Sequence, residues 1–259
     1  MINPGNGFIR EDPWRIFRIM AEFVDSFETL AAAGPAVTIF GSARMPRQDR
    51  YYKMAVDLAR ELARRLGVEA ELVTVTSAGK SVETLAEGRV DVGFFAIDPA
   101  RAATTAYTGP YVQIEGSYLV RSDSPIKTNE EVDRDGIRVA VGLKSAYDLY
   151  LTRELKKAKI ERAPTSPAVV DYFLANKLDV AAGVKQQLEM DAKRLPGLRL
   201  LPGRFMVINQ AMGMTRGKEA GAKYLTAFVE EMKASGFVAD GLRRHKIEGA
   251  AVAPPGGAP

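Results

Sequence analysis

Residues 81–121, SVETLAEGRVDVGFFAIDPARAATTAYTGPYVQIEGSYLVR, decide the fold of this chain. They predict a helix that ends at Gly88 and a strand over residues 90–95. The chain is expected to break at 108–110 (TGP) and to continue as one extended run over 111–121. A run of this length is long for a strand in a chain of this size. We therefore predict that it crosses between two lobes.

The turn after the predicted strand points to an anion site. Asp98 suits the N-cap of a helix and Pro99 suits its first turn, so a new helix is expected to begin there. The free N–H groups of that helix and the guanidinium of Arg101 would then meet at one strand end. A carboxylate is the kind of group that such a site binds.

Composition excludes several classes of function. The chain has 259 residues, 46% of them apolar and 26% charged, as in an ordinary globular protein with room for two lobes. It has no cysteine and one histidine, His245, which excludes thiolate chemistry and makes a histidine triad or metal cluster untenable. We predict neither a cofactor nor a metal.

Charge and hydropathy limit the partners. The net charge of +4 favours anionic ligands but falls short of a nucleic-acid-binding signature. No apolar run is long enough for membrane insertion, and the first residues lack a signal-peptide pattern. As written, the chain is expected to be cytoplasmic.

An internal repeat predicts two similar halves. At an offset of 88, LAEGRVDVG (85–93) aligns with FLANKLDVA (173–181), and VTIFGS (37–42) resembles VAVGLKS (139–145). Each half is therefore expected to be β–α–β–α–β. Gly88 aligns with Asn176, and both residue types tolerate the left-handed position after a helix.

The predicted boundaries follow from this repeat. We expect an N-terminal arm and helix (1–34), a first lobe that starts at 35–110 and returns at 217–248, and a second lobe at 122–203. Hinge crossings are expected at 111–121 and 204–216, and a disordered Gly/Pro-rich tail at 249–259.

The carboxyl ends of the strands in both lobes are expected to line one cleft, because open α/β sheets bind ligands there. The candidate ligand-binding residues are Phe40, Ser42, Arg44, Ser77, Phe95, Ile97, Arg101, Lys144, Ser145, Tyr147, Gly183 and Lys185. No residue of this set is expected to be catalytic.

Residues 54–247 carry a family resemblance. MAVDLARELARRLGVEAELV, the LAEGRVDVG…DPARA…YTGPY run, RVAVGLKSA, LANKLDVAAG and AMGMTRGKEAGAKYLTAFVEEMKASGFVADGLRR follow in order. They resemble bacterial solute-binding protein family 3, with the type-2 periplasmic binding fold. The resemblance implies an α/β fold of two lobes with two crossover strands, closing around a small solute such as an amino acid. It also implies an ABC-transporter permease as partner, a monomer and a periplasmic location, and a ligand carboxylate held at Arg101.

Two positions depart from the family pattern. Phe94, Phe95 and Ala96 stand where hydroxyl residues usually precede the arginine. Gly183-Val184-Lys185 stands where an acidic residue usually holds the ligand ammonium. Arg101, Lys144 and Lys185 would then make the cleft cationic without an obvious counter-acid, so a small anion such as an organic acid fits it better than an amino acid. We therefore predict a binding module without enzymatic activity.

Residues 2–53 resemble another family. INPGNGFIREDPWRIFRIMAEFVDSFETL and GPAVTIFGSAR are similar to the start of the lysine-decarboxylase-like (cytokinin riboside monophosphate phosphoribohydrolase) family, with a junction near 50–56. The GGGPG-type loop and PGGxGTxxE motif of that family do not occur. The alternatives are thus a phosphoribohydrolase-like Rossmann protein without its catalytic motifs, or a dehydratase-type enzyme on the binding-protein scaffold.

Overall fold

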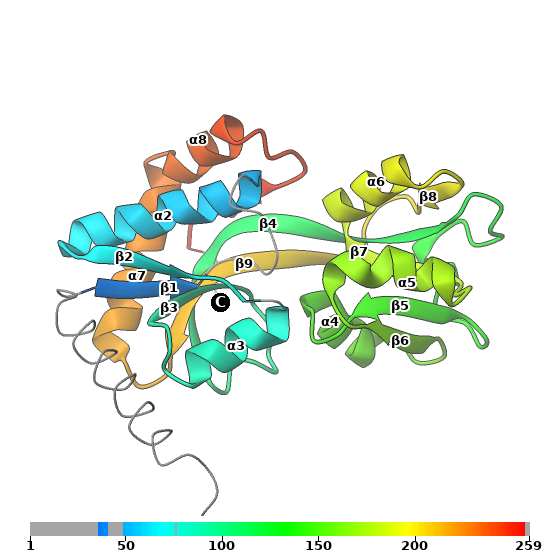
Figure 1. The fold of residues 1–259 in the computed structure, drawn as a ribbon, viewed down its shortest axis with the longest axis horizontal. Coiled ribbons are helices and arrows are strands. Elements are labelled where there is room, and N and C mark those ends of the chain that lie inside the picture. The colour runs from blue at the N-terminus through cyan, green and yellow to red at the C-terminus, as the bar shows by residue number, and fades with distance from the viewer. Residues whose placement is uncertain (1–35, 41–48, 76, 257–259) are drawn as a thin grey trace, which may run out of the picture.

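The computed structural model describes residues 36–40, 49–75 and 77–256. The predicted N-terminal arm and helix, and the turn that contains Ser42 and Arg44, lie outside this part of the chain. Within it, two α/β halves lie side by side and are joined by two long strands (Figure 1).

The two halves repeat the same order of elements, as the sequence predicts. The first contains β1 (Ala36–Phe40), α2 (Arg50–Leu66), β2 (Glu69–Val73), α3 (Ala78–Ala86) and β3 (Val92–Ala96). The second contains β5 (Arg138–Gly142), α4 (Ala146–Glu154), β6 (Lys159–Ala163), α5 (Val169–Ala175) and β7 (Val180–Val184). In each half the first strand lies between the other two, and all three are parallel. The alignment of Gly88 with Asn176 predicts a left-handed Asn176 after α5, but the left-handed residue there is Lys177.

Strands β4 (Thr105–Arg121) and β9 (Met206–Thr215) run antiparallel to each other through both halves. They join the strands of the two halves into one sheet with the order β2-β1-β3-β9-β4-β7-β5-β6. The predicted break at 108–110 is wrong, since β4 continues through it. The pairing with β9 shifts register on both sides of Pro110, which has no N–H to donate. The shift thus absorbs the proline without ending the strand.

Helices cover both faces of each sheet, which buries the strands on two sides. In the first half α2, α7 (Glu219–Ala234) and α8 (Phe237–Arg244) pack on one face and α3 on the other. In the second half α4 packs on one face, and α5 with α6 (Lys185–Arg194) on the other. Helix α2 illustrates how the spacing of apolar residues determines which side of a helix is buried. Met54, Leu58 and Leu62 recur every four residues and are buried, and Gly67 ends the helix with φ = 68°.

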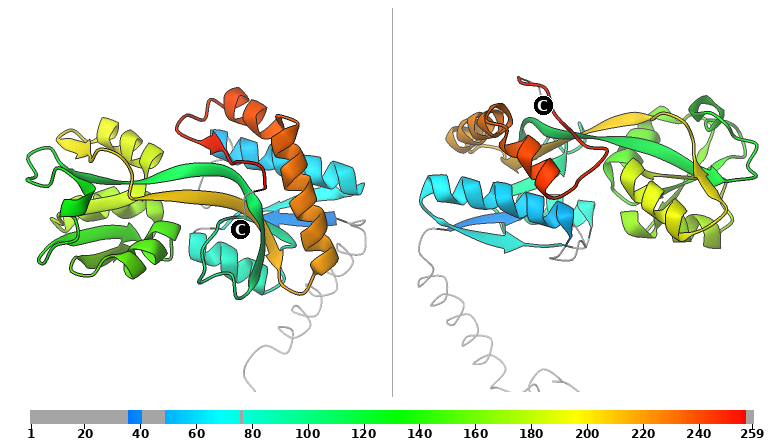
Figure 2. Two further views of the ribbon diagram at one scale, coloured as in Figure 1. Left: turned by 180° about the vertical axis from the view of Figure 1, so that it is seen from behind. Right: turned by 90° about the horizontal axis from the view of Figure 1, so that it is seen from above.

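The tail differs from the disorder that its composition predicts. Strand β10 (Ala251–Val252) pairs with Val112 and Gln113 of β4, and the views in Figure 2 show it beside that strand. Strand β4 is the outermost long strand of the first half, so its free edge offers unpaired backbone groups. The Ala253 N–H also donates to the Tyr111 carbonyl over 3.1 Å. The tail therefore covers the edge of a crossing strand.

Removing residues 249–259 is expected to lower the free energy of unfolding by about 2 kcal/mol, because the backbone pairing with β4 and the hydrogen bonds to the Lys233 and Glu230 side chains of α7 are lost. Urea unfolding measures this change, and hydrogen exchange should rise at the Gln113 amide, which lies on the side of β4 that faces β10. A chain that ends at Gly256 keeps these contacts and is the control. Equal stability of the two truncated chains would show that the tail contributes nothing.

Candidate functional site

A cavity of about 370 Å³ lies between the two halves. It is bounded by the ends of strands, the starts of helices and the middle of the crossing strands. Among the residues that line it are Ser77, Ala78, Ser81, Phe94, Phe95, Ala96, Arg101, Tyr111, Ile114, Leu143, Ser145, Tyr147, Thr165, Ser166, Gly183, Val184, Gln186, Ile208 and Gln210.

Three helices begin at the cavity. The N-caps of α3, α4 and α6 are Ser77, Ser145 and Val184, and each of them lines it. The two serine hydroxyls accept hydrogen bonds from the backbone N–H groups of Lys80 and Asp148. The positive ends of three helix dipoles thus face one space, which favours negative charge there.

The turn before Arg101 is not the predicted helix. Residues 99–104 form successive turns, because β4 already pairs with β9 from Thr105 onward and draws the chain back into the sheet. Asp98 still caps the turn, since its Oδ1 accepts from the Ala100 N–H at 2.8 Å. The predicted helix N-terminus at Pro99 is therefore wrong, while the predicted position of Arg101 at the cavity is found.

Arg101 is 8% exposed and lines the cavity. Its guanidinium donates to the Lys144 carbonyl over 2.7 Å and to the Ala96 carbonyl over 3.3 Å. Burial lowers the pKa of this guanidinium, and the nearby Tyr107 and Asp98 offset that effect only in part. The Asp98 carboxylate is itself paired with Arg153 over 3.0 Å. Among the described residues, Arg101 thus has no ion-pair partner, and its guanidinium keeps N–H donors that the two bonds to carbonyls do not use.

The two halves touch across the cavity mouth. Besides the bond from Arg101, Lys144 Nζ lies 3.2 Å from Glu83, and Arg153 of α4 pairs with Asp98. The Lys144 side chain also lies over Gly79, where an added Cβ would come within 2.8 Å of Lys144 Cδ. A larger residue at position 79 would have to displace the exposed Lys144 side chain. The two halves are therefore in direct contact beside the cavity.

The structure brings together half of the candidate residues. Ser77, Phe95, Arg101, Ser145, Tyr147 and Gly183 line the cavity. Ile97, Lys144 and Lys185 are not among its lining residues. Lys185 pairs instead with Glu115 of β4 over 3.0 Å, and Lys144 pairs with Glu83. Phe40 ends β1, and Ser42 and Arg44 lie outside the described residues.

Sequence reasoning missed several lining residues. Thr165 and Ser166 occupy the turn that the repeat aligns with the turn at Ser77, so the repeat could have identified them. Ile114 and Ile208 come from the middle of the crossing strands, where no local motif indicates a site. Gln186 follows directly on Lys185 and carries a buried Oε1 that has no hydrogen-bond partner within the described part of the chain.

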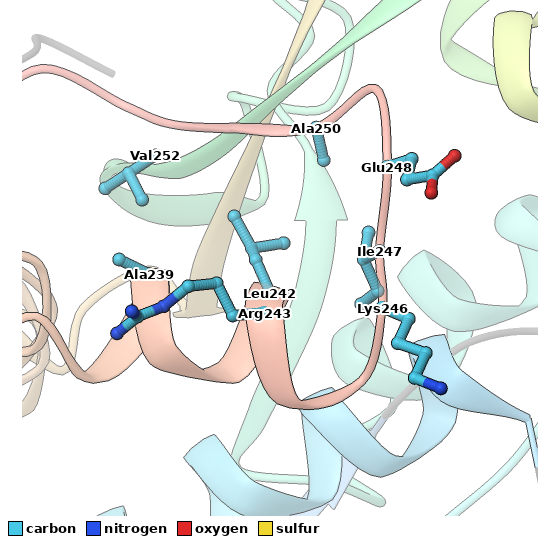
Figure 3. A pocket seen from close by; sticks show the side chains of 8 residues that line it. All are labelled: Ala239, Leu242, Arg243, Lys246, Ile247, Glu248, Ala250 and Val252. Carbon is cyan, nitrogen blue, oxygen red and sulfur yellow. The ribbon is translucent and has the colours of Figure 1, made fainter.

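A second depression, shown in Figure 3, lies on the outside of the first half, between α8 and the tail. Leu242, Ile247 and Val252 form part of its apolar surface. The charged ends of Arg243, Lys246 and Glu248 point away from one another. It offers no converging polar groups, so we take the cavity between the halves as the candidate site.

The described residues contain no group of three or more His, Cys, Asp or Glu side chains suited to a metal ion. No helix in this part of the chain combines the length and the apolar character that crossing a membrane requires.

Comparisons with known proteins agree on the fold. The structure resembles a histidine kinase sensor domain with similarity to periplasmic binding proteins (TM-score 0.71, 19% identity, 86% of this chain and 100% of that chain). It also resembles a mutant of ArgBP from T. maritima, with a TM-score of 0.68 and 21% identity over 87% of this chain and 99% of that chain. A third match is the solute receptor for L-cysteine of Neisseria gonorrhoeae, with a TM-score of 0.70 and 19% identity over 83% of this chain and 91% of that chain. No curated protein sequence matches the chain.

The family assignment comes from the sequence model of bacterial extracellular solute-binding proteins, family 3, which matches residues 47–245. Strand β1 precedes this stretch, yet it takes the place between β2 and β3. The matched stretch contains both crossing strands and every described lining residue named above. The chain therefore belongs to the bacterial extracellular solute-binding proteins of family 3, with the two-lobe type-2 periplasmic binding fold.

Proposed function

We propose that this protein binds a small anionic solute, such as an organic acid, in the cleft between its two halves. It acts as a monomer, presents the solute to the permease of an ABC transporter, and carries out no reaction on it. The proposal extends the solute-binding role of the family to one class of ligand.

The main support for this proposal is that Arg101 is buried at the cavity without a carboxylate partner among the described residues. It is a buried cation at the cavity wall, its partners are two backbone carbonyls, and no described carboxylate forms an ion pair with it. The three helix starts add positive potential to the same space. A carboxylate or similar anion would supply the missing charge and accept a two-pronged hydrogen bond.

The named relatives support a small-molecule ligand. One is named ArgBP, and one is described as a solute receptor for L-cysteine. The identities of 21% and 19% leave the ligand of this chain open to its own cavity chemistry.

The enzyme alternatives find no unengaged carboxylate among the described residues that line the cavity. Asp191 is the one carboxylate among the residues that line the cavity in the described part of the chain. It accepts from Gln187 over 3.1 Å and pairs with Arg194 over 3.0 Å, so it is already engaged. A dehydratase needs a general acid or base free to reach the substrate. Binding without catalysis fits this arrangement better.

A thermal-shift panel of carboxylates, amino acids and AMP-class nucleotides tests the proposal on the full chain. A bound carboxylate at about 100 times its Kd should stabilise the protein by roughly 2.7 kcal/mol. X-ray scattering should then show compaction as the ligand selects the closed cleft over more open ones. The proposal fails if no anion stabilises the protein, or if AMP is hydrolysed above a no-protein control.

A further inference from the structure

We infer that the solute is a monocarboxylate with an apolar body and no ammonium group, so that the cleft selects against free α-amino acids. The inference rests on the proposed function and narrows its ligand class. It depends on three properties of the lining residues: which charged side chains lack an ion-pair partner, where the walls are apolar, and which neutral polar groups remain.

The charges allow one carboxylate. Arg101 is the only cationic side chain among the described residues that line the cavity. The two lysines that the sequence suggested as further cations are paired with Glu83 and Glu115, and neither lines the cavity. A second carboxylate on the solute would therefore lose its hydration without gaining a cation.

The same count leaves no place for an ammonium group. The carboxylate of Asp191 is held by Arg194 and Gln187, and no other described lining residue is acidic. Where the second half begins α6, the residue at the cavity is Val184. The helix starts around it repel positive charge. A buried ammonium would remain without a counter-charge, which is costly.

The walls provide apolar surface for the rest of the solute. Phe94 and Tyr111 meet edge to face at 5.9 Å, and both line the cavity. Ile114 and Ile208 from the crossing strands and Val184 at the end of β7 continue this apolar surface. Burying hydrocarbon against such walls strengthens binding about fourfold for each methylene group. A hydrophobic chain or ring is thus favoured over a short polar body.

The remaining polar groups on the walls are neutral. Gln186 is 7% exposed, and its Nε2 donates to the Glu248 carbonyl, while its buried Oε1 has no hydrogen-bond partner among the described residues. This oxygen can accept one hydrogen bond from a hydroxyl or amide, but it carries no full charge to balance an ammonium. The cavity can therefore hold a neutral substituent on an apolar acid.

Isothermal titration of the full chain with matched probes tests the inference. The first set is 3-phenylpropanoate, L-phenylalanine and 3-phenylpropanamide, which share a skeleton and differ in ammonium and carboxylate. The second pairs 4-methylpentanoate with L-leucine, and phenylsuccinate adds a second carboxylate. We expect the monocarboxylate to bind at least tenfold tighter than the amino acid, the amide and the dicarboxylate.

Introducing an acid tests the cause of the selectivity. Val184→Asp should lower the affinity for 3-phenylpropanoate and raise that for L-phenylalanine at least tenfold, and the matched neutral variant Val184→Asn should not reverse the order. Preference for L-phenylalanine or L-leucine in the unmodified protein would overturn the inference and leave anion binding standing. Absence of binding by every probe would count against both.

Discussion

Replacing Arg101 by alanine is expected to weaken the binding of a carboxylate ligand by roughly 30- to 4,000-fold, which corresponds to about 2–5 kcal/mol. The large effect follows from burial, since the guanidinium is 8% exposed and a bound carboxylate would face no other free cation among the described lining residues. Arg101→Lys keeps the charge but loses the planar fork, so its affinity should fall between the two. Isothermal titration with 3-phenylpropanoate measures the series.

The control for this series is Lys185→Met, which removes a cation that pairs with Glu115 and does not line the cavity. Its ligand affinity should stay within a factor of about two of the wild type, since Arg204 still pairs with Glu115. Loss of the two bonds from Arg101 to backbone carbonyls costs about 1–2 kcal/mol of stability, so the alanine variant should still fold. Equal affinity in all three Arg101 forms would place the anion elsewhere.

The fold was predictable because its signals are local and repeated. The two β–α–β–α–β halves follow from the aligned stretches 85–93 and 173–181, and the structure gives both halves the same strand order. Helix α2 likewise follows from leucines spaced by four and from Gly67. Such patterns depend on neighbours within a few residues, so one sequence suffices to read them.

The site was predictable in its position but not in its charges. Strand ends and helix starts are local features, and they place Ser77, Arg101 and Ser145 at the cavity. Lys144 and Lys185 pair instead with Glu83 and Glu115, which lie 61 and 70 residues away from them in the chain. No spacing rule reveals such pairs, and the sequence therefore overestimates the free positive charge of the cleft.

The tail shows the limit of reasoning from composition. Glycine and proline predict disorder because they cannot form a core of their own. They do not show that β4 leaves a free edge beside the tail, or that Lys233 is buried between them. The order of residues 249–256 comes from a surface built by distant parts of the chain.

Lys233 joins these parts, and Lys233→Met is expected to lower the free energy of unfolding by about 3–4 kcal/mol. Its side chain is 2% exposed, and Nζ lies 2.6 Å from Glu230 Oε1. Nζ also donates to the carbonyls of Pro110, over 3.1 Å, and Pro254, over 3.0 Å. Methionine fills similar space, so the loss reports the three abandoned polar partners and not a cavity. Urea unfolding measures it, and Lys223→Met on the exposed face of the same helix is the control.

The pH dependence of the same variant provides a second measurement. Burial raises the pKa of Glu230, but its hydrogen bonds with the Lys233 side chain and the Gly256 N–H outweigh burial, so the pKa lies below its ordinary value of 4.5. A lowered folded-state pKa means that this contribution to stability is present above pH 4.5 and is lost as the pH falls through the folded-state value. In Lys233→Met the main favourable partner is gone, so stability should fall less steeply below pH 4.5 than in the Lys223→Met control. The same slope and the same midpoint in both variants would show that the buried ammonium does not hold the tail and β4 together.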